Sequence, residues 1–378
     1  MSRAGVYVKQ PTGYRAFIPT PLPPDPPIQY DAELLDLLSK ADQALGRLDG
    51  MGELLPNPDL FVAMYIRKEA VLSSQIEGTR ASLVDVLEFE STGDSDRVAA
   101  DVGEVVNYVN AMNYGLERLT ELPLSLRLMR EIHARLLAGV RGEERSPGEF
   151  RHSQNWIGPP GCDLMDATFI PPPPHQMKDA LNNLEKYIHR DTQTPILVKV
   201  GLVHAQFETI HPFLDGNGRL GRLLITFMLC QTGMLSRPLL YLSYYLNQHR
   251  DAYYAHLMSV RDQGDWEGWL KFFLQGVREV SHQATETAKR IQALRAEHRR
   301  HLQAQNWRVG SALNLLDKLY YRPIVSVNTV ADMLDLTFAG ASRLVSYFET
   351  EGLLREITGQ QRNRRFAYGP YLDILMEN

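Results

Sequence analysis

The stretch His211-Pro-Phe-Leu-Asp-Gly-Asn-Gly-Arg-Leu-Gly-Arg222 combines an imidazole, a carboxylate, an amide, two guanidinium groups and three glycines. Thr194-Pro195 predicts the start of a helix before it, as N-cap and first helical residue. Apolar residues recur at helical spacing on both sides, at Leu197, Val200, Val203, Phe207 and Ile210, and then at Leu220, Leu224, Phe227 and Cys230. We therefore expect a loop that leaves one buried helix and opens the next.

The chemistry of this loop favours a phosphate-bearing ligand. The glycines around Asn217 let successive backbone N–H groups point inward, and the positive end of the following helix adds to their field. Arg219 and Arg222 lie near one face of that helix and suit phosphate oxygens. The Asp215 carboxylate and a phosphate are both negative, so a cation is expected between them, and Mg²⁺ is the predicted one. His211 is the group of the stretch that exchanges a proton near neutral pH. These groups predict a site for a nucleoside triphosphate with Mg²⁺ and a general base.

A structural alternative is a glycine loop whose arginines pair with nearby acids and whose histidine caps a helix. For His211 or Asp215 alone that alternative is the better interpretation, but the complete stretch disfavours it. The P-loop pattern G-x-x-x-x-G-K-(S/T) is absent from the loop.

The stretch resembles the motif H-P-F-x-(D/E)-G-N-G-R-x-x-R of the Fic (filamentation induced by cAMP) family, with a match at every specified position. Most Fic proteins transfer AMP from ATP to a hydroxyl group of a target protein and release pyrophosphate. The resemblance implies that His211 deprotonates the target hydroxyl, that Asp215 binds Mg²⁺ and that Arg222 meets the γ-phosphate. The expected cradle of the α- and β-phosphates consists of Gly216, Asn217, Gly218 and Arg219.

A shorter pattern lies upstream, at the end of a helix expected to start at Asn57-Pro58-Asp59 and to stop at Gly78. The helix macrodipole disfavours a carboxylate at Glu77, so an arginine is expected to compensate it, and Ser73 lies one turn earlier. Ser73-Ser-Gln-Ile-Glu-Gly78 resembles the Fic inhibitory pattern (S/T)-x-x-x-E-(G/N). The resemblance implies that Glu77 pairs with Arg222 and blocks the γ-phosphate position. The alternative is a surface carboxylate at a frayed helix end.

Composition places few further limits on function. The chain has 378 residues, of which 44% are hydrophobic, and a net charge of −5, so no global attraction to nucleic acid or anionic membrane is expected. Cys162 and Cys230 are the only cysteines, which fits a reducing compartment. The apolar run 223–235 is too short to span a bilayer. We expect a cytoplasmic protein.

Residues 151–174 change in character and predict a β-hairpin around Pro159-Pro-Gly161. In Fic proteins a hairpin flap at this place is thought to hold an extended target segment by strand addition, with Trp156 and Ile157 as candidate contacts here. A purely structural hairpin is the alternative.

Residues 307–378 predict three helices and a strand pair, the order of a winged helix-turn-helix. Asn328 is the expected cap of the second helix, and the wing contains Arg355, Arg362, Arg364 and Arg365. Lys and Arg total eight in this segment, as do Asp and Glu, so DNA or a protein remain alternative partners.

Other segments carry weaker signals. Residues 1–30 are proline-rich and predict an extended arm or a disordered tail, and a helix is expected over 31–50. Tyr241, Tyr244 and Tyr245 could stack on adenine, but core packing is their commoner role. From about Ser281 to Gln305 we expect a polar helix that serves as a solvated spacer.

Together these observations predict an all-α Fic fold with a small β-hairpin flap, followed by a winged helix-turn-helix domain. The expected units are 1–120 (arm and helices with the inhibitory helix), 121–283 (Fic catalytic core), 284–306 (helical linker) and 307–378 (winged helix).

The expected function is autoinhibited transfer of AMP from ATP, with Mg²⁺, to a hydroxyl side chain of a target protein held by the 151–174 flap, with self-modification and a homodimer as open possibilities. The alternatives are transfer of another nucleotide moiety, removal of AMP at the same site, or a DNA-binding regulator with the Fic body as sensor.

Overall fold

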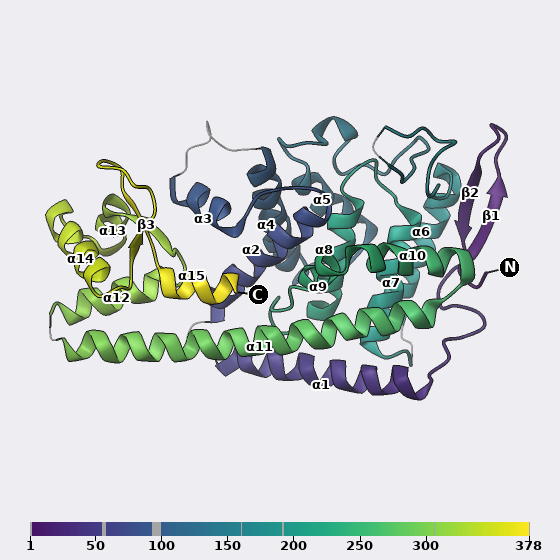
Figure 1. Ribbon diagram of the computed structural model, residues 1–378. Coiled ribbons are helices and arrows are strands. Elements are labelled where there is room, and N and C mark those ends of the chain that lie inside the picture. The colour runs from purple at the N-terminus through teal and green to yellow at the C-terminus, as the bar shows by residue number, and fades with distance from the viewer. Residues whose placement is uncertain are drawn as a thin grey trace.

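The computed structural model describes residues 2–54, 58–92, 100–159, 161–190, 193–305 and 307–377. Most of them are helical, and the strands form two small antiparallel sheets, so the prediction of a mainly helical fold is confirmed. The long helix α11 (Trp266–Ala304) lies beside α1 (Ala32–Leu54) along the base of the molecule (Figure 1). An N-terminal hairpin lies at one end and the C-terminal unit at the other (Figure 1).

Two central helices hold the stretch that the sequence singles out. Nearly every residue of α7 (Ile196–Ile210) is buried, and α8 (Asn217–Gln231) is buried along most of its length. Helices that are buried on nearly all sides must be surrounded by other elements. The predicted cap of α7 is wrong by one residue, because Pro195 with its extended ψ of 141° occupies the N-cap and Thr194 lies outside the helix.

Shorter helices enclose this pair. Contacts with α8 come from α2 (Pro58–Ile76), α4 (Ala100–Arg118) and α5 (Leu126–Leu136), and contacts with α7 come from α6 (Pro174–His189) and α10 (Arg250–Gln263). The remaining helices of the body are α3 (Leu83–Thr92) and α9 (Ser243–Gln248). As predicted, α2 stops before Gly78, whose φ is 96°, while its expected cap Asn57 lies outside the described residues.

The pairing of α1 with α11 corrects two boundaries. The sequence predicts that the first helix ends before Gly50, but α1 continues to Leu54. Gly52 allows this because a Cβ there would lie 2.4 Å from Leu239 Cδ1, so the glycine admits a close neighbour. The polar helix starts at Trp266 rather than Ser281, with Asp265 Oδ1 accepting a hydrogen bond from Gly268 N.

One side of the C-terminal half of α11 is buried, which contradicts the expected solvated spacer. Ala284, Ala288, Ile291 and Leu302 are buried there, against neighbours that include α12 and α15. Charged residues of this half also contact the C-terminal unit, because Arg295 and Arg299 both form ion pairs with Asp317 of α12. No helix in the described parts of the chain is long and apolar enough to cross a membrane.

The proline-rich N-terminal segment forms a hairpin that the sequence did not reveal. Strands β1 (Gly5–Lys9) and β2 (Arg15–Pro19) pair in antiparallel register, with Val6 opposite Ile18. Phe17 is buried, and its N–H donates to Ile170 O in the segment that was predicted as the flap. The extended conformation was therefore predicted correctly and the strand pairing was missed.

The C-terminal unit contains α12 (Val309–Leu319), β3 (Ile324–Ser326), α13 (Val327–Leu334), α14 (Phe338–Thr350), β4 (Arg355–Glu356), β5 (Arg365–Ala367) and α15 (Gly369–Met376). Its sheet has the antiparallel order β3-β5-β4. The sequence predicted the three helices and the strand pair but neither β3 nor α15. Ser326, not the predicted Asn328, caps α13 by accepting from Thr329 N.

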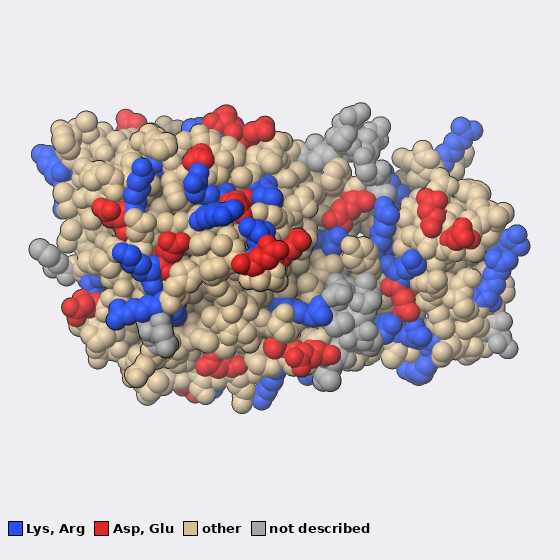
Figure 2. All heavy atoms as spheres, turned by 180° about the vertical axis from the view of Figure 1, so that it is seen from behind, with Lys and Arg blue, Asp and Glu red and all other residues tan. Residues whose placement is uncertain are grey.

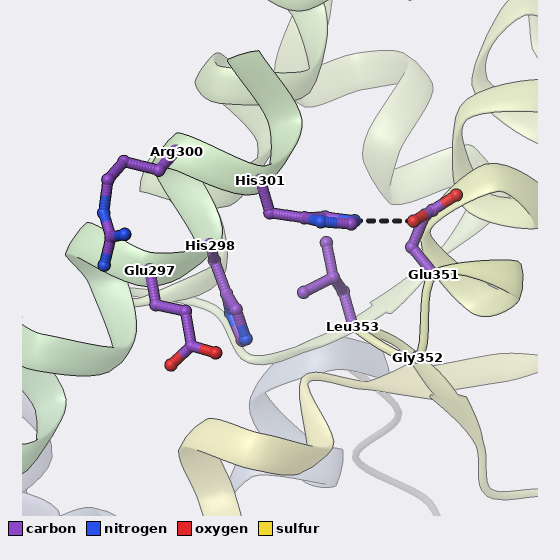
Figure 3. Close-up of a pocket in the computed structure, with 7 residues that line it drawn as sticks. All are labelled: Glu297, His298, Arg300, His301, Glu351, Gly352 and Leu353. Carbon is purple, nitrogen blue, oxygen red and sulfur yellow. Dashed lines mark hydrogen bonds and ion pairs between the residues drawn. The ribbon is translucent and has the colours of Figure 1, made fainter. Parts of the chain in front are cut away.

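Polar contacts anchor this unit to the rest of the chain. His301 Nε2 of α11 lies 2.6 Å from Glu351 Oε2, beside a surface pocket of about 470 Å³ (Figure 3). Lys68 Nζ of α2 donates to Leu375 O of α15. Ion pairs engage three of the four predicted wing arginines, namely Arg355 with Asp373, Arg364 with Glu349 and Arg365 with Glu88.

Acidic and basic side chains are interspersed on the face of the molecule that Figure 2 shows, as the small net charge suggests.

Candidate active site

The loop between α7 and α8 depends on two residues in the left-handed region. His211 ends α7 with φ 49° and donates its N–H to Phe207 O, and Gly216 is the N-cap of α8 with φ 76°. A left-handed conformation is ordinary for glycine, but it is uncommon for a histidine. Strain of this kind at a non-glycine residue is typical of functional sites.

Side chains within and around the loop fix its shape. Asn217 Oδ1 accepts from Phe213 N at 2.9 Å, and Asn217 Nδ2 donates to Phe213 O at 2.8 Å. His133 of α5 stacks on the Phe213 ring and contacts Asp215 O through Nε2 at 2.9 Å. Its Nδ1 accepts from Gly148 N, so Nε2 carries the proton, and burial lowers the His133 pKa to about 4. No motif in the sequence points to His133, which lies far from the loop along the chain.

The first turn of α8 offers unpaired backbone donors. Helix geometry leaves the first N–H groups without intrahelical acceptors, and no side chain caps this end. The side-chain amide of Asn217 already bonds to Phe213 within the loop, so Asn217 can bind an anion only through its backbone N–H. A positive helix end with free N–H groups suits an anion.

Glu77 lies over this same turn. Its Oε1 accepts from Arg222 Nη2 at 2.7 Å, the contact that the resemblance implies. Ser73 holds the guanidinium from the other side, through Oγ to Nε at 2.7 Å and through its carbonyl to Nη2 at 3.0 Å. Burial raises the Glu77 pKa, but the adjacent Arg222 outweighs burial and leaves the pKa below its ordinary value. A Cβ on Gly218 would lie 2.2 Å from Glu77 Oε1, so only glycine permits this approach.

His211 is held with its ring in a dry environment. Its carbonyl accepts from Arg151 Nε at 2.9 Å and from Asn155 Nδ2 at 3.2 Å, and both donors come from the segment predicted as the flap. Nδ1 is buried and has no hydrogen-bond partner among the described residues. Burial, followed by the charges of Arg261 and Arg151, lowers the His211 pKa to about 3. The imidazole is therefore neutral at physiological pH and able to accept a proton.

A pocket of about 540 Å³ brings the two motifs together. Glu77, His211, Gly218 and Arg222 line it with flap residues and with one face of α10. That face contributes Arg250, Tyr253, Tyr254, Leu257, Met258 and Arg261. Residues 238–283 carry a helical pattern, so a helix is predicted here, but no pattern places it against the motif, and the tyrosines considered for adenine are three earlier ones. Two of those, Tyr241 and Tyr245, are buried in the core, and Tyr241 stacks on Tyr65.

The predicted β-hairpin over 151–174 is reduced to one bridge. Ile157 and Phe169 exchange both backbone hydrogen bonds, at 2.8 and 3.0 Å, but the described residues around them form no longer ladder. The prolines at 159 and 171–174 explain this, because proline has no N–H to donate to a ladder. Trp156 and Ile157 both line the pocket, and Trp156 is 41% exposed.

Of the predicted phosphate cradle, Gly218 lines the pocket, whereas Gly216, Asn217 and Arg219 do not, and the predicted Mg²⁺ ligand Asp215 also lies outside its lining. Arg219 is buried and donates through Nη1 to Glu104 Oε2 of α4 at 3.0 Å. Asp215 Oδ1 accepts from Gly216 N at 2.6 Å and lies 3.7 Å from Arg219 Nη2. Asp215 Oδ2 faces Gly142, where a Cβ would lie 2.9 Å away, and its side chain is 38% exposed.

The Asp215 carboxylate fits Mg²⁺ only when a bound nucleotide supplies further oxygen ligands. In the described parts of the chain, no three His, Cys, Asp or Glu side chains come together to hold a metal. Mg²⁺ commonly binds through one or two carboxylates together with substrate phosphates. One accessible carboxylate next to an anion-binding helix end matches that arrangement.

Comparison with known proteins agrees with the site. Residues 35–117 match the family model described as Fic/DOC family N-terminal, and residues 123–229 match that described as Fic/DOC family. A probable protein adenylyltransferase, aq_aa38 of Aquifex aeolicus, is 29% identical over 182 residues, which are 47% of this chain and 51% of that protein. Protein adenylyltransferase Fic of Drosophila melanogaster is 28% identical over 204 residues, 52% of this chain and 37% of that protein. The chain thus spans about half or less of these relatives.

Solved structures share the fold. A Fic family protein from Desulfovibrio desulfuricans G20 superimposes with a TM-score of 0.58 at 20% identity, over 90% of this chain and 97% of that chain. A Fic domain containing signaling protein from Bacteroides thetaiotaomicron gives 0.51 at 18% identity, over 68% and 97%.

Proposed function

This chain is a Fic-domain protein, and from that premise we propose that it transfers AMP from ATP to a hydroxyl side chain of a target protein. The observation that carries the proposal is one pocket that joins the neutral imidazole of His211, the uncapped end of α8 and the guanidinium of Arg222. These are the groups that nucleotidyl transfer to a hydroxyl requires: a base, an anion cradle and a cation for the polyphosphate.

In the proposed reaction, His211 removes the proton from the target hydroxyl as its oxygen attacks the α-phosphorus of ATP. The bond from the α-phosphorus to the bridging oxygen breaks, and pyrophosphate leaves with the electron pair. The negative phosphates of bound ATP would raise the His211 pKa from its value of about 3, which would make the ring a better base. Backbone N–H groups of α8 and Arg222 hold the phosphates. Mg²⁺ held by Asp215 would neutralise charge on the leaving pyrophosphate.

We propose that Glu77 inhibits this reaction. Its bond to Arg222 occupies the guanidinium that the γ-phosphate needs, and its carboxylate lies against Gly218 at the end of the anion cradle. Like charges that meet there repel, so ATP in its productive position and Glu77 in the observed position exclude each other. The support is the contact geometry, with Ser73 fixing Arg222 in the inhibited arrangement.

For the target, we propose that the 151–174 flap holds an extended segment next to His211. Trp156 and Ile157 line the pocket on this side, and Arg151 and Asn155 tie the flap to the carbonyl of His211. Tyr254, which is 41% exposed, offers an aromatic surface to the adenine in the same pocket. The chain itself is one candidate target.

For the C-terminal unit, we propose a winged helix-turn-helix in which α14 occupies the recognition position. The order of its helices and the β4–β5 pair support this fold. A protein partner fits better than DNA, because carboxylates already neutralise three arginines of the wing. We retain DNA as the alternative partner.

ATP labelled in either the α- or the γ-phosphate tests the reaction, with Mg²⁺, a cell lysate and the Glu77→Gly variant. Protein label from the α-phosphate alone is expected. Label from the γ-phosphate would contradict AMP transfer in favour of phosphoryl transfer. Label that appears only with another nucleotide donor, or loss of AMP from premodified protein, would favour the two alternative reactions of the same site.

A further inference from the structure

A buried carboxylate outside both motifs contacts the nucleotide loop. Glu104 lies on α4, with its side chain 2% exposed, and neither the loop 211–222 nor the pattern 73–78 includes it. Its Oε2 accepts from Arg219 Nη1 at 3.0 Å, and the Arg219 side chain is 1% exposed. A buried ion pair of this kind is costly to break from one side, because the remaining charge lacks a partner.

Two further groups converge on the same carboxylate. Arg141, from the loop after α5, approaches Glu104 Oε1 through Nε at 3.2 Å. Thr79 Oγ1, two residues after Glu77, donates to Glu104 Oε2 at 3.4 Å. Glu104 therefore connects the nucleotide loop, the loop after α5 and the turn that follows the inhibitory helix.

Arg219 has a second acidic neighbour within the nucleotide loop. Its Nη2 lies 3.7 Å from Asp215 Oδ1, longer than a hydrogen bond, whereas Nη1 bonds to Glu104 at 3.0 Å. Arg219 Nε is buried and has no hydrogen-bond partner within the described parts of the chain. The guanidinium is thus shared unequally between two carboxylates, and Glu104 holds it at hydrogen-bond distance.

We propose that Glu104 is a positioning residue that keeps Arg219 bound to α4 and thereby leaves Asp215 available to the divalent cation of a cation–ATP complex. This inference rests on the proposed nucleotide site. Without the charge of Glu104, Arg219 would move onto Asp215 and neutralise the carboxylate that the cation needs. Loss of Glu104 would then lower the affinity for ATP with Mg²⁺ more than the affinity for ATP without it.

The test measures equilibrium binding of ATP, with Mg²⁺ and with a chelator, in variants built on Glu77→Gly. The readout is the ratio of the two affinities, checked against thermal unfolding of each variant. Glu104→Gln is expected to lower the Mg²⁺-dependent gain in affinity about tenfold, the loss of one charge-assisted contact. Glu69→Gln is the matched control, because Glu69 is a buried carboxylate that bonds to Tyr108 and Ser243 instead of Arg219. It should leave the ratio unchanged.

Two more variants keep the test decisive. Glu104→Gln combined with Arg219→Gln should recover the ratio, since residue 219 then carries no charge that could neutralise Asp215. Glu104→Asp retains the charge and should retain most of the Mg²⁺-dependent gain, even if Glu104→Gln folds poorly. Equal weakening of both affinities by Glu104→Gln, or loss of the gain in Glu104→Asp, would overturn the inference. A Glu77→Gly parent that binds no ATP would overturn the proposed function and this inference with it.

Discussion

Glu77 and Arg222, which lie 145 residues apart in the chain, meet at 2.7 Å between Oε1 and Nη2 over the first turn of α8. The Arg222 side chain is 1% exposed and the Glu77 side chain 31% exposed. The arginine is thus fixed inside the protein, while the carboxylate stands at the edge of the pocket and is the partner that can leave.

Replacement of Glu77 by glycine should therefore raise AMP transfer. The contact is a charge-assisted hydrogen bond, and its removal frees Arg222 for the γ-phosphate, so an increase of about tenfold or more is expected. The rate of α-phosphate label incorporation into lysate proteins measures it. Glu90→Gln is a control that breaks the partly buried ion pair between Glu90 of α3 and Arg67 of α2, and it should leave the rate unchanged. A Glu77→Gly rate equal to that of the unmodified chain would contradict inhibition.

Replacement of His211 by alanine should abolish transfer without abolishing ATP binding. Loss of a general base lowers rates by about 10²- to 10⁴-fold. The comparison is made in the Glu77→Gly background, where transfer is measurable. Because the backbone of residue 211 makes the contacts with Arg151 and Asn155, the loop should survive the substitution. Transfer that persists at the parental rate would exclude His211 as the base.

Asn217→Ala should destabilise the protein. The buried amide of Asn217 closes the loop by bonding to both N and O of Phe213, and its removal leaves these groups unpaired. The expected loss is about 1–3 kcal/mol in the free energy of unfolding, measured by urea denaturation. Asn113→Ala on α4 is an exposed control that should change stability little. An unchanged urea midpoint for Asn217→Ala would show that the loop does not depend on this ring of hydrogen bonds.

Glu69 should make stability fall as pH rises. Burial raises its folded-state pKa to about 7 from an ordinary value of 4.5, against the opposing effect of hydrogen bonds from Ser243 and the charge of Arg222. Between these values the folded state binds more protons than the unfolded state, so this contribution is present below pH 4.5 and is lost as pH rises to 7.

The difference in unfolding free energy between the unmodified chain and Glu69→Gln isolates this effect, because the other titrating groups are common to both. The difference should favour the unmodified chain at low pH and shrink up to pH 7. A difference that is constant across this range would mean that the Glu69 pKa is not raised.

The loop could be predicted from the sequence because its chemistry is local. His211, Gly216 and Arg222 lie within one continuous stretch, and helical periodicity on both sides predicts that this stretch connects two helices. The contact between Glu77 and Arg222 was accessible only through the resemblance to a family, since a single sequence does not show which helices pack together.

The rest of the site depends on tertiary packing. Tyr253 and Tyr254 are ordinary residues of an amphipathic helix until α10 is placed against the motif. Glu104 and His133 contact the loop from helices that carry no motif. Errors at the ends of elements have local causes: Gly52 is tolerated within α1 because it admits Leu239, and Ser326 caps α13 two residues earlier than expected.

Intact-protein mass spectrometry after incubation with ATP and Mg²⁺ tests the central claim most directly. It compares the unmodified chain, Glu77→Gly and Glu77→Gly/His211→Ala, each alone and with a target lysate. We expect an AMP-sized gain on protein that is strong for Glu77→Gly, weak for the unmodified chain and absent for the double variant. No AMP-sized gain in any sample, on the chain itself or on lysate proteins, would contradict the account.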